Sequence, residues 1–218
     1  MKKVCLLGTS PTLPEAPMND DSIEKWALNN MYHIVPAEKI SRWFQIHSKE
    51  SVQASTDWEK YKEITVPIYM QDHYEEIPSS VKYPLEEMTK LFGYKLFRST
   101  LDFMMAIAIA EEYDEIHIYG VDMANNTEFA HQRPTLMYWI GRAIGMGIKI
   151  FLPDDCDLMK NYFVYGYDDE KKSDFETKAR ARKAKLEAQG RQGEKDYYLA
   201  KGAIDTFDFL LRDIGVTP

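Results

Sequence analysis

The sequence lacks the features that mark several large classes of protein. Its 218 residues include only two cysteines, whose positions fit neither a disulfide framework nor a zinc site. No apolar stretch approaches the roughly 18 residues of a membrane span, and the first apolar run is too short for a signal peptide. We therefore expect a cytoplasmic protein with reduced thiols and no membrane partner.

Phosphate-binding loops of the common kinds are missing as well. The chain has 11 glycines, but no G-x-G-x-x-G motif and no P-loop ending in Gly-Lys-Ser/Thr. Asp122 has no second carboxylate at D-x-D spacing, so the sequence gives no support for metal dependence. A formal net charge of −8 argues against a nucleic-acid-binding surface over the whole protein and leaves room only for a local basic patch.

The apolar residues that are present form an alternating pattern of short strands and helices. Hydrophobic residues make up 44% of the chain, enough for a full core. Strand-like runs occur at 3–8, 43–47, 65–70, 116–120 and 148–152, and helical patterns at 22–31, 55–63, 84–92, 99–112 and 134–147. This alternation predicts an α/β fold with a doubly wound, mostly parallel, Rossmann-like sheet.

The composition changes after Tyr167. Residues 168–192 are highly charged and include a basic run at 171–191, whereas 194–213 carry an apolar stripe at helical spacing. We therefore expect a Rossmann-like nucleotide-binding domain at 1–167 and a C-terminal helical hairpin at 168–218. The basic run is best interpreted as a solvated helix face, with an anionic acceptor or a homo-oligomer contact through the hairpin as alternatives.

Polar residues follow several of the apolar segments in the first half of the chain. Ligands of open α/β sheets bind beyond the carboxyl ends of strands. Gly8, Thr9, Ser10 and Thr12 supply a close backbone approach, hydroxyls and N–H groups suited to phosphate or ribose, or else form an ordinary turn. The amides of Asn29 and Asn30 suit a ribose or a base edge, or else cap a helix. His47 follows the next strand, where a polar turn is the favoured interpretation.

A second polar group lies between residues 98 and 133. Arg98, Ser99 and Thr100 open an apolar helix, and the strand at 116–120 ends in Gly120-Val121-Asp122. A loop with Asn125 and Glu128 then leads to His131 and Arg133 before a predicted helix. An imidazole there could serve as a general base, and Arg133 with the helix amides could favour a phosphate leaving group. The alternatives are a capping His131 and a structural Asp122.

These motifs together resemble a known family. In their order along the chain they are Gly8-Thr9-Ser10-Pro11-Thr12-Leu13, Leu28-Asn29-Asn30-Met31-Tyr32, Arg98-Ser99-Thr100, Gly120-Val121-Asp122 and Ile148-Lys149-Ile150-Phe151. The pattern resembles bacterial sialyltransferases that act on lipooligosaccharide, and Rossmann-like proteins related to archaeal pterin pyrophosphokinases. The resemblance spans residues 4–160 and implies that His131 takes the place of the general base proposed for that family.

The chain departs from the sialyltransferase pattern in its opening turn and in the loop before His131. Ser10 replaces the second glycine of the turn, and the loop is shorter and lacks tyrosines that would bind a donor phosphate. Residues 41–47 and 128–134 are similar to segments of small tailed-phage proteins. That similarity implies an enzyme in the host cytoplasm, with a hydroxymethylated base in DNA as acceptor.

The leading hypothesis is a metal-independent glycosyltransferase that uses a nucleotide-activated sugar and no separate cofactor. His131, Arg98 and Arg133 are its candidate catalytic residues. The candidate nucleotide-binding residues are Gly8, Thr9, Ser10, Thr12, Asn29, Asn30, Ser99, Thr100, Gly120 and Asp122. Two alternatives are a non-catalytic protein that sequesters a nucleotide signal and a pterin-type pyrophosphokinase, which would need magnesium and clustered carboxylates.

Overall fold

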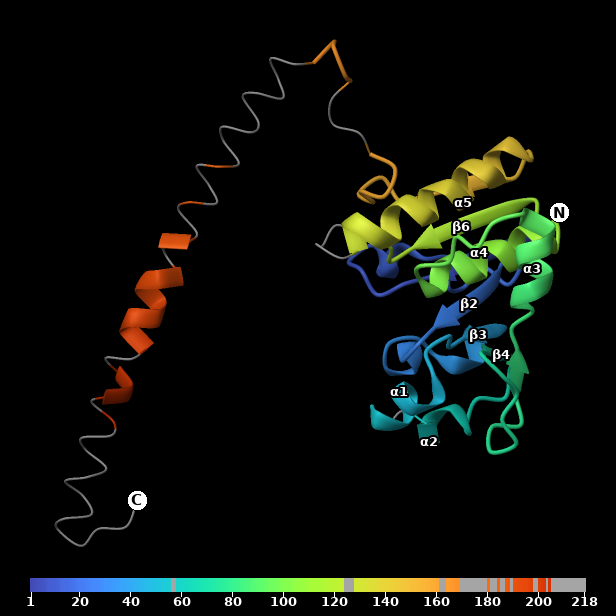
Figure 1. The fold of residues 1–218 in the computed structure, drawn as a ribbon, viewed down its shortest axis with the longest axis horizontal. Helices are drawn as coiled ribbons and strands as arrows, with labels where there is room; N and C mark the ends of the chain where they lie inside the picture. The colour runs from blue at the N-terminus through green and yellow to red at the C-terminus, as the bar shows by residue number, and fades with distance from the viewer. Residues whose placement is uncertain are drawn as a thin grey trace, which may run out of the picture. The chain divides into compact units, whose positions relative to one another are not determined.

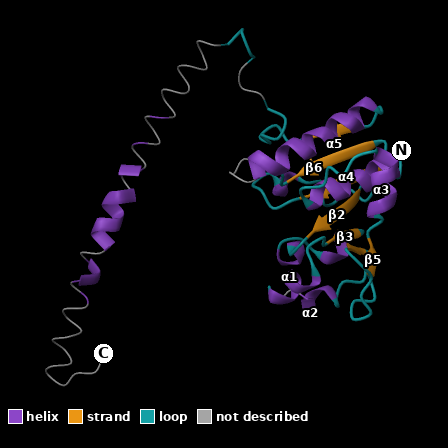
Figure 2. Ribbon diagram, viewed as in Figure 1, coloured by secondary structure: helices purple, strands orange, loops and turns teal. Residues whose placement is uncertain are grey.

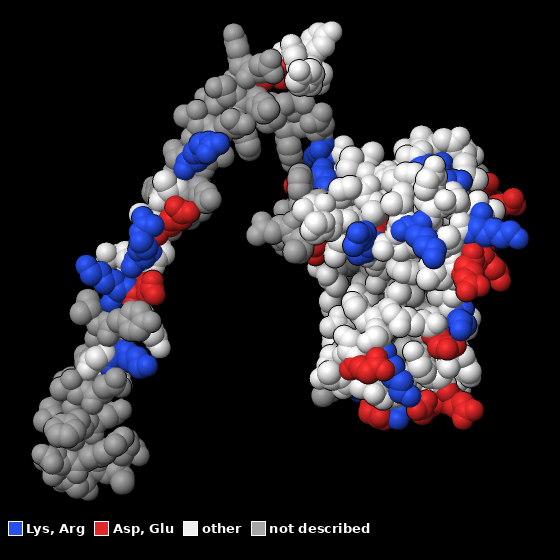
Figure 3. Space-filling model, in the orientation of Figure 1, with Lys and Arg blue, Asp and Glu red and all other residues white. Residues whose placement is uncertain are grey.

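The computed structural model describes residues 1–55, 58–123, 128–160 and 164–168, together with isolated positions and short runs between 180 and 204. The chain divides into two units, Met1–Lys160 and Asn161–Pro218. The hairpin predicted for 168–218 therefore lies largely outside the described residues. Those described from 180 onward are helical and exposed, and their charged side chains carry both signs (Figure 3).

The first unit is built on a sheet of seven parallel strands in the order β5-β4-β3-β2-β1-β6-β7 (Figures 1 and 2). The strands are β1 Lys3–Leu7, β2 Glu24–Leu28, β3 Arg42–Phe44, β4 Ile68–Met70, β5 Ser80–Lys82, β6 Glu115–Tyr119 and β7 Lys149–Phe151. The order of the strands reverses between β1 and β6. The predicted doubly wound, Rossmann-like sheet is thereby confirmed.

The helices cover this sheet and add the buried surface that a parallel sheet requires. They are α1 Lys49–Ala54, α2 Trp58–Tyr61, α3 Leu85–Phe92, α4 Thr100–Ala110 and α5 Arg133–Gly145, with a short π-helix at Glu128–Gln132. Helix α4 packs against β1 and β2, whereas α5 packs against α4 and β7. Eight of the eleven residues of α4 are buried, which confirms the central apolar helix predicted for 99–112.

The helix predicted for residues 22–31 is wrong, because this segment contains β2. Apolar Ile23, Trp26 and Ala27 have the spacing of one helix face, but β2 lies between β1 and β3 and is buried on both faces. A strand buried in this way has no alternating pattern that would distinguish it from a short helix. Lys25 is tolerated inside the sheet because its ammonium group donates a hydrogen bond to the Asp20 carbonyl.

An ion pair fastens the end of α4 to β3. Nη1 and Nη2 of Arg42 lie 2.6 and 2.8 Å from the two carboxylate oxygens of Glu111, and the guanidinium stacks 4.6 Å above the ring of Trp26. Burial alone would raise the pKa of Glu111, but the hydrogen bonds and charge of Arg42 outweigh it and the pKa lies below its ordinary value. The pair therefore stabilises the fold at neutral pH, and this contribution is lost as the pH falls through the pKa of Glu111.

We expect Glu111→Gln to lower the free energy of unfolding by about 2 kcal/mol at pH 7, because a half-buried guanidinium loses its bidentate partner. Chemical denaturation at pH 7 and pH 4 measures this, and the difference should shrink at the lower pH. Glu59→Gln is the matched control, since its partner Lys62 lies 2.7 Å away in an exposed pair. Equal effects of the two substitutions would contradict the prediction.

Candidate functional site

The turns that follow β1 and β6 are in close contact at the point where the strand order reverses. The N–H of Gly8 donates to the carbonyl of Tyr119 at 2.8 Å, and the N–H of Ser10 donates to the carbonyl of Gly120 at 2.8 Å. A Cβ atom on Gly8 would lie 2.3 Å from the oxygen of Gly120, and one on Gly120 would lie 2.3 Å from the oxygen of Gly8. Only glycine at both positions allows this approach.

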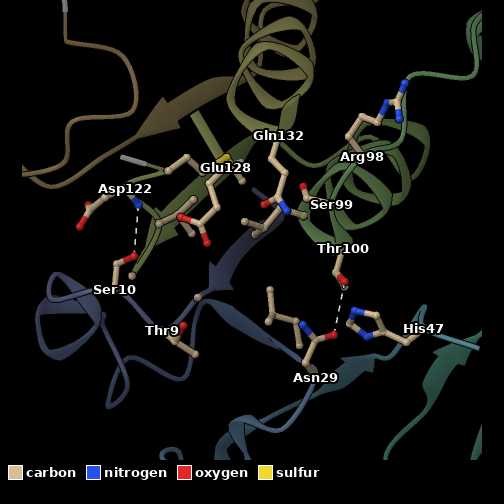
Figure 4. Close-up of a pocket in the computed structure, with 16 residues that line it drawn as sticks. Thr9, Ser10, Asn29, His47, Arg98, Ser99, Thr100, Asp122, Glu128 and Gln132 are labelled. Atoms are coloured by element: carbon tan, nitrogen blue, oxygen red, sulfur yellow. Dashed lines mark hydrogen bonds between the residues drawn. The ribbon is translucent and has the colours of Figure 1, made fainter. Parts of the chain in front are cut away.

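A cavity of about 270 Å³ opens beside this contact, beyond the carboxyl ends of β1, β2 and β6 (Figure 4). It occupies the position at which open α/β sheets bind their ligands. The structure brings together in its lining most of the residues that the sequence singled out: Gly8, Thr9, Ser10, Asn29, Arg98, Ser99, Thr100, Gly120 and Asp122. Residues from four separate segments of the chain thus meet at one place.

Two of the predicted nucleotide-binding residues lie elsewhere. Thr12 is buried and does not line the cavity, and its Oγ1 accepts a hydrogen bond of 3.0 Å from the N–H of Gly120. This bond braces the two turns against each other. Asn30 lines a neighbouring cavity of about 250 Å³, which shares Asn29 and His47 with the first.

The predicted catalytic residues near α5 do not line the cavity. His131 is exposed on the π-helix, whereas its neighbours Glu128 and Gln132 face the cavity. The guanidinium of Arg133 donates to the carbonyls of Asp157 and Leu158 at 2.6 and 3.0 Å. Arg133 thereby ties the start of α5 to the segment that follows β7. Asn125 lies outside the described residues.

The start of α4 is held in the cavity wall by a carboxylate that sequence reasoning missed. Oδ2 of Asp102 accepts hydrogen bonds from the N–H groups of Arg98 and Ser99 at 2.7 and 2.8 Å, and from Oγ1 of Thr135 at 2.9 Å. Ser99 is the N-cap residue and Asp102 occupies the third helical position. The signal was present in the sequence as Ser-x-x-Asp, the spacing of a capping box.

Asn29 connects the end of β2 to the start of α4. Its backbone is left-handed, with φ of 45°, a conformation that asparagine tolerates better than most residues. Its N–H donates to the carbonyl of Phe44 at 2.9 Å, and its Oδ1 accepts a 3.3 Å hydrogen bond from Oγ1 of Thr100. The side-chain amide is therefore fixed inside the cavity, as Figure 4 shows.

The acidic and basic groups of the cavity are separated. Asp122 and Glu128 lie on the β6 side, whereas the exposed guanidinium of Arg98 lies at the rim, at the start of α4 (Figure 4). Burial and the charge of Asp157 raise the pKa of Asp122 against the opposing charge of Lys160. Among the described residues, no group of three or more His, Cys, Asp or Glu is placed to hold a metal ion.

No protein-family model and no curated protein matches this sequence. Solved structures do match. A point mutant of the α-2,3/8-sialyltransferase CstII is 18% identical, with 74% of this chain and 90% of that chain covered and a TM-score of 0.50. CstII from Campylobacter jejuni in complex with the substrate analogue CMP-3FNeuAc is 19% identical over 70% of this chain and 80% of that chain, with a TM-score of 0.49.

The chain has a sialyltransferase-like fold. The likeness that the sequence motifs predicted is confirmed at this level, because an identity of 18% establishes the fold alone. The resemblances to pterin pyrophosphokinases and to phage proteins stay predictions. In the part of the chain that the structure describes, none of the helices combines the length and apolar character of a membrane span.

Proposed function

We propose that this protein is a glycosyltransferase that takes its sugar from a nucleotide-activated donor. The observation that carries the proposal is the polar cavity at the reversal of strand order, where Gly8 and Gly120 meet beside the start of α4. Its volume of about 270 Å³ is close to the lower end of the range for ligand sites, about 300–1,000 Å³. The shared fold with CstII supports the same assignment.

The cavity offers different chemistry to each part of a nucleotide. Thr9, Ser10 and the first turn of α4 present hydroxyls and N–H groups, which suit the phosphate. The amide of Asn29 and the carboxylate of Asp122 suit ribose hydroxyls and the edge of a base. Arg98 at the rim would stabilise the negative charge that develops on the departing phosphate.

The proposed reaction forms one bond and breaks one. The oxygen of an acceptor hydroxyl bonds to the anomeric carbon, and the bond from that carbon to the donor phosphate breaks with its electron pair on the phosphate oxygen. The hydroxyl proton passes to a base of the protein. We propose that the reaction proceeds without a metal ion. Backbone N–H groups and Arg98 would instead stabilise the negative charge on the departing phosphate.

We expect nucleotide binding to depend on Asn29 far more than on its neighbour Asn30. Asn29→Asp keeps the acceptor for Thr100 and the left-handed backbone, but places a negative charge in the cavity proposed to hold the anionic nucleotide. Affinity should fall about 10-fold or more, the effect of roughly 1.4 kcal/mol of repulsion. Asn30→Asp adds the same charge to the neighbouring cavity and should change affinity less than about 3-fold.

Isothermal titration of the full chain with CMP, UDP, GDP and CMP-N-acetylneuraminate, with and without EDTA, measures these affinities. Product analysis with free sugars and with DNA containing hydroxymethylated pyrimidine then tests the acceptor predicted from the phage resemblance. Binding without turnover of any activated sugar would instead favour a protein that sequesters nucleotides. A strict magnesium requirement would favour a pyrophosphokinase, and failure of every nucleotide to bind would overturn the proposal.

A further inference from the structure

The second cavity adjoins the first and has a different character. Its volume is about 250 Å³, and it is lined by Asn29, Asn30, Gln45, His47, Ser51, Val52 and Ser55. No Lys, Arg, Asp or Glu is among these described lining residues, so the cavity offers amides, hydroxyls and one imidazole. Asn29 and His47 line both cavities, which places them at the junction.

Hydrogen bonds to Gln45 fix the imidazole of His47 at this junction. The side chain of Gln45 is buried, and its Nε2 donates to the hydroxyl of the fully buried Tyr61 at 2.6 Å. On the other side, Oε1 of Gln45 accepts from the backbone N–H of His47 at 3.2 Å and lies 2.6 Å from Nδ1 of its ring. The ring therefore has a buried support, although it is itself exposed to the cavities.

This network determines which ring nitrogen of His47 carries the proton. The backbone N–H of His47 can only donate, so the group of Gln45 that faces it is the carbonyl oxygen. Because that oxygen can only accept, Nδ1 of His47 must donate to it. In the neutral ring Nε2 then carries no hydrogen and is a proton acceptor, as a general base must be. Figure 4 shows the ring beside Thr100 and Asn29.

We propose that the second cavity binds a neutral, hydroxyl-bearing acceptor and that Nε2 of His47 is the base that removes the proton of its reacting hydroxyl. This inference rests on the proposed function and adds the acceptor site to it. With the nucleotide in the first cavity, the sugar of the donor reaches the junction where His47 lies. The acceptor oxygen bonds to the anomeric carbon, its proton moves to Nε2, and the phosphate leaves with the bonding electron pair.

The chemistry of the lining selects the class of acceptor. Amide and hydroxyl groups such as those of Asn30 and Ser51 exchange hydrogen bonds with sugar hydroxyls in both directions. An anionic acceptor would find no cationic side chain in this lining to replace its lost hydration. We therefore expect a saccharide or another neutral alcohol, with water as the smallest acceptor.

Hydrolysis of the donor by water tests His47 without knowledge of the natural acceptor. His47→Asn retains a side-chain N–H near the position of Nδ1 but removes Nε2. We expect release of nucleotide from CMP-N-acetylneuraminate, or from the UDP- or GDP-sugar that the titration selects, to slow by about 100-fold or more. Nucleotide affinity should stay within about 3-fold. The matched control is His33→Asn, which alters an exposed histidine outside both cavities.

A second measurement reads the tautomer directly. Long-range ¹H–¹⁵N spectra of the full chain should show neutral His47 protonated at Nδ1, and Gln45→Met should shift the ring toward a mixture of tautomers while slowing hydrolysis. A ring protonated at Nε2 would overturn the inference whatever the kinetics. If His47→Asn binds the donor and hydrolyses it as fast as wild type, the role of His47 is overturned and the proposed function stands. The same holds if hydrolysis is lost only in His131→Asn. Absence of donor binding would reject the proposed function itself.

Discussion

Replacing Gly8 with alanine should lower the free energy of unfolding by at least about 3 kcal/mol, because the new methyl group has no room. Its carbon would lie 2.3 Å from the carbonyl oxygen of Gly120 and 2.8 Å from Cγ2 of Val121. Both atoms belong to the backbone or to a buried residue at the end of β6, so relief requires β1 and β6 to move apart. That movement would also deform the cavity floor, so nucleotide binding should be lost as well.

Alanine substitutions at two other glycines are controls that distinguish the steric overlap at Gly8 from changes in backbone strain or helix propensity. Gly93, which ends α3, has φ of 79° and nothing within 4 Å of the added carbon, so Gly93→Ala reports backbone strain alone, about 1 kcal/mol. Gly141 lies inside α5 with open space around it, so Gly141→Ala should stabilise the protein by up to about 1 kcal/mol. The expected order of stability is therefore Gly141→Ala, wild type, Gly93→Ala, Gly8→Ala.

Urea denaturation of the four proteins, monitored by fluorescence, measures this order of stability. Titration with CMP measures whether the cavity still binds nucleotide. Gly8→Ala with wild-type stability would show that the turns after β1 and β6 do not need their close contact. Gly8→Ala that is destabilised but binds nucleotide normally would show that the contact supports the fold without shaping the site.

The sequence predicted the fold because most of its elements carry local signals. Strands at 3–8 and 116–120 are short apolar runs, the helix at 84–92 lies between Pro84 and Gly93, and the apolar helix at 99–112 opens with Ser99. Residues 22–31 failed because β2 is buried on both faces, and burial on both faces removes the alternating pattern. Strand β5 was missed because its three residues lie at the edge of the sheet.

The candidate site was predictable where it depends on strand ends, and not where it depends on long-range contacts. Residues 8–10 and 98–100 directly follow a strand or open a helix, so their placement in the cavity follows from topology. Local sequence favoured His131, which precedes a predicted helix, over His47, for which a polar turn was the favoured interpretation. In the structure His47 lines both cavities and His131 lines neither. The support of His47 depends on the hydrogen bond of Gln45 to Tyr61, a contact between residues 16 positions apart.

Asp102 makes the stability of this protein depend on pH. The direction is opposite to that expected from carboxylates with lowered pKa values, such as Glu111. The side chain of Asp102 is fully buried, and burial raises its pKa to about 6 against the lowering effect of the hydrogen bonds from Arg98, Ser99 and Thr135. Because its pKa in the unfolded chain is close to 3.8, the folded state binds more protons between these values. Its contribution to stability is therefore largest at low pH and falls as the pH rises through about 6.

We expect Asp102→Asn to remove this dependence. The difference in unfolding free energy, wild type minus variant, should fall by about 2 kcal/mol between pH 4.5 and pH 7, since a tenfold change in an ionisation constant on folding corresponds to about 1.4 kcal/mol. Carboxylates with lowered pKa values, such as Glu111, are present in both proteins and cancel in the difference. Urea denaturation at four or five pH values measures it.

A difference that is constant or rises with pH would show that Asp102 is ionised in the folded protein at pH 4.5 and that its hydrogen bonds outweigh its burial. Whether Asp102 is charged also matters for the first cavity, because its carboxylate holds the N–H groups of Arg98 and Ser99 at the cavity wall. A charged Asp102 binds those groups more strongly than a neutral acid does. As Asp102 ionises between pH 5 and 7, the start of α4 should therefore be held more tightly at the cavity wall, while the contribution of Asp102 to the stability of the fold declines.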